Sequence, residues 1–373
     1  MRPTFDAVTR FIASLDHPII TKISYFIDQY TPIFYIISLI LFASTLRKEN
    51  KLLKTILAIM IAVGITFSLK YLIHTPRPCT LDPSYVVYEC PPAPDYSFPS
   101  GHVAISSVFL APLVGTNAFP IFLLLNLLVG FSRINLGVHF LNDVLASFVI
   151  GFFSYDIANR LISSKTLTIS KPTRTLETTL EIRRQALHII VCIFLVVSII
   201  FSSLVYGQNG PVYVEFLVFI GIMVMLWIIN DKLLGKESKV SKVMFSMFER
   251  SGVIPGYGAF WYAMGVLFLF VFITDVNYLI ASIIALGIGD GVATLVGKYG
   301  RLQNPLDRNK TVEGTLGFFT SVMLLSYPFV GMLAIPLAAL TAIVEAIPPK
   351  FDDNFTIPLS CIIFYHIFVR PFF

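Results

Sequence analysis

Residues 189–206, IIVCIFLVVSIIFSSLVY, contain no charged side chain over a length that fits one crossing of a lipid bilayer as an α-helix. Comparable apolar runs recur from about Thr31 to the C-terminus, and short polar stretches separate them. Inside a bilayer every backbone amide and carbonyl needs an internal partner, which a helix supplies. The sequence therefore predicts an all-α, polytopic membrane protein with about 12 spanning helices.

The composition agrees with this class. Hydrophobic residues make up 56% of the chain and charged residues only 13%, which is more apolar surface than a soluble protein can bury. The formal net charge of +5 is carried by loops, where basic residues beside spans orient a membrane protein. No basic surface with interleaved aromatic residues accompanies these charges, so we expect no nucleic-acid partner.

The chain divides into two expected domains joined by a polar linker. Residues 163–182 are rich in Ser, Thr and basic residues, which is typical of a linker. Residues 1–162 offer five spans after an N-terminal segment that lacks a signal-peptide pattern and is expected to form interfacial helices over residues 1–30. Residues 183–373 offer seven more spans. The expected spans are 31–46, 52–73, 101–117, 119–132, 139–161, 185–206, 211–230, 257–274, 277–297, 314–330, 331–347 and 356–371.

Basic residues in the short loops predict the orientation of these spans. Loop 47–54 and the linker are rich in Lys and Arg, which assigns both to the cytoplasm, and the basic loops of the second half fall on the same side. Loop 74–100 then faces outward, where Cys79 and Cys90 can form a disulfide if the compartment is oxidising. We expect an integral protein of the plasma membrane.

Polar residues gather at the outer ends of the expected helices of the first domain. Charges at membrane depth are unfavourable, so such groups indicate a functional site. Lys70, Arg77 and Arg133 offer three cations, and arginine contacts phosphate oxygens in a bidentate manner. Ser100 and Gly101 precede an apolar helix whose first N–H groups attract anions. These features predict a phosphate-binding site.

Two histidines supply the remaining chemistry. His139 and Asp143 stand four residues apart on one helical face, so the carboxylate can hold the imidazole in its nucleophilic tautomer. His102 is left as the general acid for the departing alkoxide. A lone His-x3-Asp pair is more often structural, but three groups in this order favour phosphoryl transfer without a metal.

The motifs that carry these residues, K-x6-RP, PSGH and SR-x5-H-x3-D, resemble the signature of the type 2 phosphatidic acid phosphatase and haloperoxidase superfamily. The resemblance covers roughly residues 30–162 and implies a phosphohistidine intermediate at His139, with His102 as acid and Asp143 as the orienting carboxylate. The five-span layout further resembles the undecaprenyl-pyrophosphate phosphatases of that superfamily.

The second half has its own polar residues, which fall on the cytoplasmic side. Asp290 lies inside an apolar run rich in glycine, Lys310 precedes a further span, and Asp353 follows Glu345 after a short connection. Glycines let the backbone approach phosphates, lysine neutralises them and carboxylates hold Mg²⁺, so this half predicts a nucleotide site. Two alternatives stay open: the glycines can serve close helix packing, and Glu345 can be a capped interfacial acid.

The segments RRQALH, GDGVATLVGKYG, NKTVEGTLG and DDNFTIP resemble motifs of the dolichol kinase family, which includes phytol kinases and is akin to CTP:phosphatidate cytidylyltransferases. The resemblance covers about residues 181–373 and implies CTP as phosphoryl donor, Mg²⁺ and a polyprenol-like acceptor. It implies catalysis by Asp290 and Lys310, with the metal held by Asp290 and Asp353. The nucleotide-binding residues that it implies are Gly291, Gly297, Lys298, Thr311, Glu313, Gly314, Asn354, Arg184 and His188, where Arg184 stands at a position that is often Lys in the family.

The sequence therefore predicts an enzyme that recycles polyprenyl or dolichyl phosphate. An outward-facing site is expected to hydrolyse polyprenyl monophosphate or diphosphate, and a cytoplasmic site is expected to phosphorylate polyprenol with CTP. One alternative is glycerolipid metabolism, with a phosphatidate-like phosphatase and a CTP-dependent diacylglycerol kinase or cytidylyltransferase. Another alternative is a lipid scramblase or transporter in which the sites are vestigial.

Overall fold

The computed structural model describes residues 7–15, 17–45, 50–82, 90–91, 95–163, 174–236, 238–248, 255–305, 307, 310–347 and 352–370. These residues form helices and no β-strand, apart from one isolated bridge between Gln303 and Thr311. The expected all-α class is confirmed.

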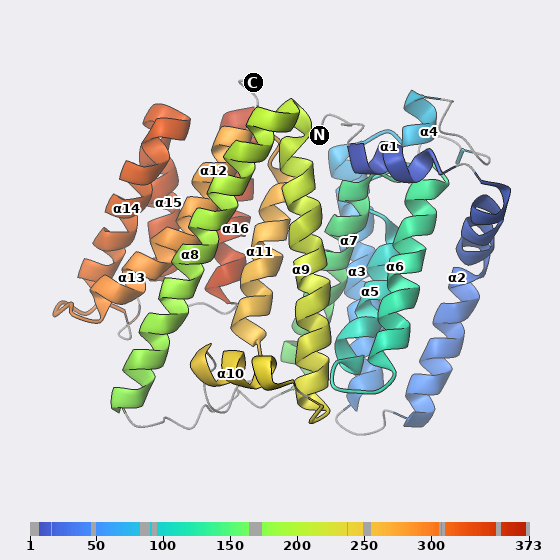
Figure 1. The fold of residues 1–373 in the computed structure, drawn as a ribbon, viewed down its shortest axis with the longest axis horizontal. Coiled ribbons are helices and arrows are strands. Elements are labelled where there is room, and N and C mark those ends of the chain that lie inside the picture. The colour runs from blue at the N-terminus through green and yellow to red at the C-terminus, as the bar shows by residue number, and fades with distance from the viewer. Residues whose placement is uncertain are drawn as a thin grey trace. The chain divides into compact units, whose positions relative to one another are not determined.

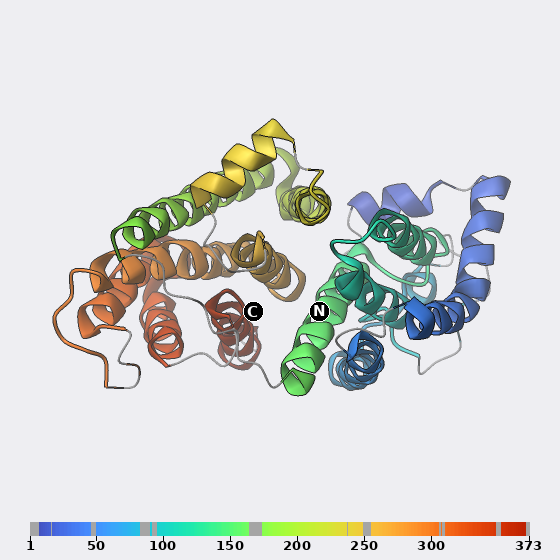
Figure 2. The ribbon, with the colours of Figure 1, turned by 90° about the horizontal axis from the view of Figure 1, so that it is seen from below.

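The chain splits into two compact units (Figures 1 and 2). Residues 1–168 with 229–236 make up the first unit, and residues 169–228 with 237–373 make up the second. Half of the expected linker, residues 164–173, lies outside the described residues, and residues 174–182 belong to helix α8. The domain limits 1–162 and 183–373 therefore stay a prediction.

The helices follow one another in both units with short connections. From the N-terminus they are α1 (Ala7–Ala13), α2 (Pro18–Thr45), α3 (Lys51–Ile73), α4 (Pro78–Leu81), α5 (Gly101–Leu110), η3 (Ala111–Leu113), α6 (Phe119–Asn135) and α7 (Leu141–Ile162). They continue with α8 (Arg174–Tyr206), η4 (Gly207–Asn209), α9 (Gly210–Leu233), α10 (Lys239–Phe248), α11 (Tyr257–Phe272), α12 (Val276–Ile284), η5 (Ala285–Gly289) and α13 (Asp290–Gly297). The last are α14 (Val312–Val330), η6 (Gly331–Leu333), α15 (Ala334–Ala346), α16 (Asp353–Phe364) and η7 (Tyr365–Val369).

Many of these helices suit a membrane. Apolar side chains point outward, as Leu72 at 75% exposure and Leu204 at 81% exposure illustrate, which lipid tolerates and water does not. The expected count of about 12 spans stays a prediction. Six segments among the described residues are long and apolar enough to cross a bilayer: Pro18–Leu41, Lys51–Leu81, Leu141–Ile162, Leu180–Leu233, Val276–Gly297 and Val312–Ala346. Four shorter apolar helices add Gly101–Leu113, Phe119–Asn135, Tyr257–Phe272 and Asp353–Val369.

The N-terminal part differs from the expected interfacial helices over residues 1–30. In this part only α1 forms a short helix of its own, and in Figure 1 it lies across the direction of the long helices of its unit. Helix α2 already begins at Pro18 and continues through Pro32, where the expected span begins. A proline inside a helix removes only one backbone hydrogen bond. Just before Pro32, the Thr31 hydroxyl adds a hydrogen bond to the helix by donating to the Ile27 carbonyl at 2.5 Å.

Close packing of α3, α5 and α7 positions the first site. Small residues such as Ala58, Ala62 and Ala104 lie at their contacts and let the backbones approach. A Cβ atom on Gly151 of α7 would lie 2.5 Å from Cβ of Ser107 on α5, so only glycine fits there. The N-terminal ends of α5 and α7 also lie together, since the Ser100 amide donates to the Asp143 carbonyl at 3.3 Å.

A break in helical geometry positions the second site. The turn η5 between α12 and α13 is π-helical, and Asp290 follows it directly. Such turns are frequent at functional sites because they re-aim side chains. Helix α14 packs on α13, and a Cβ atom on Gly314 would lie 2.8 Å from the Ala293 carbonyl oxygen.

Candidate active sites

The turn between α6 and α7 carries a buried histidine–aspartate pair. Nδ1 of His139 lies 3.3 Å from Oδ2 of Asp143, and both side chains are 2% exposed. The same carboxylate oxygen accepts hydrogen bonds from the Phe140 amide at 2.8 Å and from the Ser97 hydroxyl. Asp143 is therefore firmly held, and it faces Nδ1 of the imidazole, which leaves Nε2 for attack.

The surroundings keep this imidazole neutral. Burial lowers the pKa of His139 well below its ordinary value of 6.5, and the charges of Arg77 and Arg133 act in the same direction. A neutral imidazole retains the free electron pair that a nucleophile requires. The geometry and the charge state thus both suit the role expected for His139.

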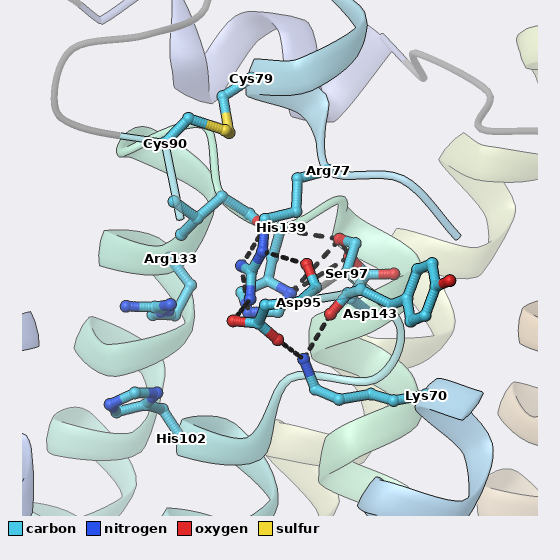
Figure 3. Close-up of polar contacts among 12 residues, drawn as sticks. Lys70, Arg77, Cys79, Cys90, Asp95, Ser97, His102, Arg133, His139 and Asp143 are labelled. Atoms are coloured by element: carbon cyan, nitrogen blue, oxygen red, sulfur yellow. Dashed lines mark hydrogen bonds and ion pairs between the residues drawn. A yellow bond between two sulfur atoms is a disulfide. The ribbon is translucent and has the colours of Figure 1, made fainter. Parts of the chain in front are cut away.

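Two cations converge in front of His139 (Figure 3). Lys70, at the end of α3, places Nζ 2.9 Å from Oδ1 of Asp95, and Arg77, just before α4, places Nη2 2.6 Å from Oδ2 of the same residue. Nη1 of Arg77 lies 3.4 Å from Nε2 of His139. Both cations therefore lie where they can contact a phosphoryl group bound to this histidine.

The other two expected residues meet a different carboxylate. Arg133 of α6 forms an ion pair with Asp28 of α2, and Nε2 of His102 in α5 lies 4.0 Å from the same Asp28 oxygen. Figure 3 shows Arg133 and His102 beside one another, next to the group around His139. Two acids thus bind these four residues, Asp95 contacting Lys70 and Arg77, and Asp28 contacting Arg133 and His102.

The N-terminus of α5 contributes an anion-binding element. Ser100 precedes the helix and Gly101 begins it. The Ser100 hydroxyl and Nε of Arg133 are buried and have no hydrogen-bond partner. Because buried polar groups are normally paired, these two atoms are available to a bound anion.

In the second unit, Lys310 lies between two carboxylates. Its Nζ is 3.0 Å from Oε1 of Glu345 on α15 and 3.2 Å from Oδ2 of Asp353 on α16. Burial acts to lower the pKa of Lys310, but the charges of Asp353 and Glu345 outweigh it and raise that pKa above its ordinary value. Lys310 is therefore a constant cation at this site, and Glu345, at 7% exposure, belongs to it.

The acids of this site suit a hard cation. Asp290 is within electrostatic range of Asp353 and Glu345, the two acids that contact Lys310. Oδ1 of Asp353 and Oδ1 of Asn354 are buried without a hydrogen-bond partner. Mg²⁺ prefers such oxygen ligands and takes one or two carboxylates together with phosphate oxygens. Among the described residues no group of three His, Cys, Asp or Glu side chains forms a metal site, and Mg²⁺ binding by Asp290 and Asp353 stays a prediction.

Helix α8 brings two further expected residues to the second unit. Nη2 of Arg184 lies 2.5 Å from Oε1 of Glu181, and Arg184 is also within electrostatic range of Asp290. His188 stacks on Tyr262 of α11 with ring centroids 4.4 Å apart, and the Tyr262 hydroxyl donates to the backbone carbonyl of His188. Nε of Arg184 and Nδ1 of His188 have no hydrogen-bond partner, although they are buried.

The remaining expected nucleotide residues make local contacts. Thr311 caps α14 by accepting a hydrogen bond from the Gly314 amide at 3.2 Å. Glu313 turns toward the preceding loop, where it accepts from the amides of Arg301 and Leu302. Lys298 is exposed at the end of α13. A role of these residues in nucleotide binding stays a prediction.

Two of the glycines have a packing reason. A Cβ atom on Gly291 would lie 2.8 Å from Cγ1 of Ile189, and one on Gly297 would lie 3.0 Å from Oγ1 of Thr311. Both glycines therefore serve close contact between segments, and for Gly291 this is the alternative that the sequence left open. Their contact with a nucleotide stays a prediction.

Three acids of these sites, Asp28, Asp95 and Glu345, lie outside the motifs. For two of them the sequence holds a usable signal. Asp28 is the acidic residue of the apolar helix α2, and Glu345 lies in the apolar helix α15. Acids in apolar spans are functional candidates by default. Asp95 lies in a loop, where an acid is ordinary, so only the folded structure reveals it.

Parts of the chain are similar to known proteins. Residues 51–167 match the model of the PAP2 superfamily. The chain is 37% identical over 105 residues to the uncharacterized protein MJ1137 of Methanocaldococcus jannaschii, covering 28% of this chain and 54% of that protein. It is 28% identical over 144 residues to CTP-dependent diacylglycerol kinase 1 of Saccharomyces cerevisiae, covering 31% of this chain and 49% of that protein. The chain thus spans about half the length of these curated relatives.

Among solved structures, the crystal structure of Aquifex aeolicus LpxE is similar with a TM-score of 0.34 and 28% sequence identity, over 41% of this chain and 93% of that chain. Residues 51–167 are thus similar to the PAP2 superfamily, and the chain is also similar to a protein named as a CTP-dependent kinase.

Proposed function

We propose that the chain is a bifunctional enzyme of lipid-carrier recycling, which hydrolyses polyprenyl phosphate or diphosphate in its first unit and phosphorylates polyprenol with CTP in its second. The observation that carries the proposal is that each unit has a buried charged site of its own. The pair His139–Asp143 beside Lys70 and Arg77 supports the first activity, and Lys310 among carboxylates supports the second.

The first reaction runs through the enzyme's own side chains. Nε2 of His139 attacks phosphorus, so a P–N bond forms while the bond to the lipid oxygen breaks, and His102 gives its proton to that oxygen. His102 then takes a proton from water, which attacks the phosphohistidine and releases phosphate. Lys70, Arg77 and Arg133 hold the phosphoryl oxygens and balance the charge that develops on them.

The second reaction transfers the terminal phosphoryl group of CTP. The hydroxyl oxygen of the lipid forms a bond to that phosphorus while the bond to CDP breaks, and the hydroxyl proton is released. Asp290 and Asp353 would hold Mg²⁺, which when bound shields the charge of the triphosphate. Lys310 lies beside Asp353, where it contacts the phosphates and draws the nucleotide to these carboxylates.

Glycerolipid chemistry is a second candidate. The similarity to a protein named CTP-dependent diacylglycerol kinase favours it, because the acceptor of the kinase part would then be diacylglycerol. A lipid scramblase with vestigial sites is a third reading, and it predicts no turnover at all.

One experiment separates the three. The purified full-length protein is incubated with CTP, Mg²⁺ and a panel of polyprenols, diacylglycerol and their phosphates, and the products are identified by mass spectrometry. Polyprenyl phosphate formed from CTP supports the proposal, whereas preferential formation of phosphatidate supports the second candidate. Transfer from ATP in preference to CTP would contradict both kinase assignments.

The proposal includes the sidedness of the two reactions. Basic residues in loop 47–54 support a cytoplasmic location of that loop, and hence an outward-facing first site. The disulfide between Cys79 and Cys90 supports the same orientation, because disulfides persist on the oxidising side of a membrane. The second site would then use cytoplasmic CTP.

A further inference from the structure

Asp95 connects the two cations that stand in front of His139. One carboxylate oxygen accepts from Nζ of Lys70 at 2.9 Å and the other accepts from Nη2 of Arg77 at 2.6 Å. Two oxygens of one anion thus bridge two cations, which is the arrangement that two oxygens of a phosphoryl group would adopt.

The carboxylate is not needed to hold these cations in place. Nε of Arg77 donates to the backbone carbonyl of Asp95 at 3.0 Å, and Nη1 donates to the carbonyl of Val138 at 2.9 Å. Lys70 likewise donates to the carbonyl of Tyr96. Backbone carbonyls therefore hold both side chains, and the Asp95 carboxylate accepts one further hydrogen bond from each of them.

We infer that the carboxylate of Asp95 is an internal anion that occupies the phosphate positions on Lys70 and Arg77, and that a phosphorylated substrate binds by displacing it. The inference rests on the proposed phosphatase activity of the first unit. It adds that Asp95 weakens phosphate binding, because every phosphate must compete with a tethered carboxylate.

Exposure and charge fit this role. The side chain of Asp95 is 49% exposed, whereas those of Lys70 and Arg77 are 13% and 3% exposed, so the acid can turn into solvent while the cations stay. Burial acts to raise the pKa of Asp95, but its hydrogen bond with Lys70 and the charge of Arg77 outweigh it and hold that pKa below its ordinary value. Asp95 is thus an anion throughout the physiological pH range. Without it, two largely buried cations would lie unpaired before substrate arrives.

Phosphate affinity tests the inference directly. Inorganic phosphate is titrated calorimetrically into the purified full-length protein in detergent. Asp95→Asn and Asp95→Ala remove the competing charge, and each should bind phosphate about tenfold more tightly than wild type, equivalent to about 1.4 kcal/mol. Asp95→Glu keeps the charge and should stay within about twofold of wild type.

Asp156→Asn provides the matched control. Asp156 pairs with Arg160 at 2.6 Å, so the same chemical change removes an ion pair from the same unit. It lies about 20 Å along α7 from Asp143, and phosphate affinity should not change.

Two outcomes would overturn the inference. Equal or weaker phosphate binding by the neutral Asp95 variants would overturn it while the phosphatase proposal stands. A second outcome is that no form, including wild type, binds phosphate or hydrolyses lipid phosphate. It would overturn the phosphate site and the inference together. If the neutral variants unfold during purification, they are purified again in phosphate buffer, where phosphate can take the place of the missing carboxylate. Recovery of folded protein supports the inference, and continued unfolding overturns it.

Discussion

The imidazole of His139 and the carboxylate of Asp143 are 3.3 Å apart, and both are almost completely buried between α6 and α7. The carboxylate faces Nδ1, while Arg77 lies on the Nε2 side of the ring. The two ring nitrogens therefore have different neighbours, one that orients the ring and one that contacts the group to be transferred. This asymmetry is what a phosphohistidine mechanism requires.

Substitution of the pair should separate the two activities. His139→Ala should abolish lipid phosphate hydrolysis and leave CTP-dependent phosphorylation intact, because the nucleophile belongs to the first unit. Asp143→Asn removes the orienting charge and should lower hydrolysis less completely, by about 100-fold. Both rates are measured on one purified preparation, with the exposed His17→Ala as control. Hydrolysis that survives His139→Ala would remove the nucleophile assignment.

The pH dependence of stability should report the neutral His139. Its pKa in the folded protein lies below the ordinary value of 6.5 that the unfolded chain has, so the unfolded state binds the proton first as the pH falls. The stabilisation that goes with the lowered pKa is present above pH 6.5 and is lost as the pH falls below it. The difference in thermal midpoint between wild type and His139→Ala should therefore shrink from pH 7.5 to pH 5. A difference that grows toward acid pH would indicate a protonated His139.

Part of the first site could be expected from its short motifs. Lys70, Arg77, His139 and Asp143 lie together, because helix ends on one side of a bundle converge, and their catalytic roles stay a prediction. The partners of the cations could not be predicted, since the contact between Asp28 and Arg133 links residues 105 positions apart. Such a contact depends on how α2 packs on α6, which a periodic apolar pattern does not specify.

The start of α2 shows a second limit of the sequence pattern. Pro32 suggests a helix boundary, because proline rarely lies inside a helix in water. The loss of one backbone hydrogen bond does not end this helix, which continues through Pro32. The glycines of α13 show a third limit. Glycine is expected where the backbone approaches a phosphate and also where two helices pack closely, so the sequence does not distinguish these two roles.

Chelation should distinguish the two reactions. The cations of the first site are Lys70, Arg77 and Arg133, which EDTA does not remove, so hydrolysis should change by less than about twofold. Phosphorylation by CTP should stop, because Asp290 and Asp353 act there through Mg²⁺, and excess Mg²⁺ should restore it. Product formation is followed for both reactions before and after EDTA. Loss of hydrolysis that Mg²⁺ restores would contradict a first site built on side-chain cations.

Substitutions in the second unit should have the reverse effect of those at His139. Asp290→Asn weakens the metal site, and Lys310→Ala removes the cation between Glu345 and Asp353. Each should lower CTP-dependent phosphorylation by at least about 100-fold, because phosphoryl transfer depends on charges positioned around the triphosphate. Hydrolysis by the same preparations should be unchanged, which also controls for folding. Normal phosphorylation by either variant would show that the nucleotide binds elsewhere.

The last prediction concerns the side of the membrane on which each site opens. Single cysteines at Leu81 and Leu302 report the two sides, since these side chains are 42% and 63% exposed. The native cysteines can stay, because Cys79 and Cys90 are bridged and the other two are buried. A membrane-impermeant maleimide added to intact cells should label position 81 but not 302, and permeabilisation should expose 302. With this arrangement a phosphate-bearing lipid is hydrolysed outside, returns as the less polar alcohol, and is phosphorylated again from cytoplasmic CTP. Labelling of both positions in intact cells, or of 302 alone, would mean that the basic loops do not set the orientation and that both reactions need another arrangement.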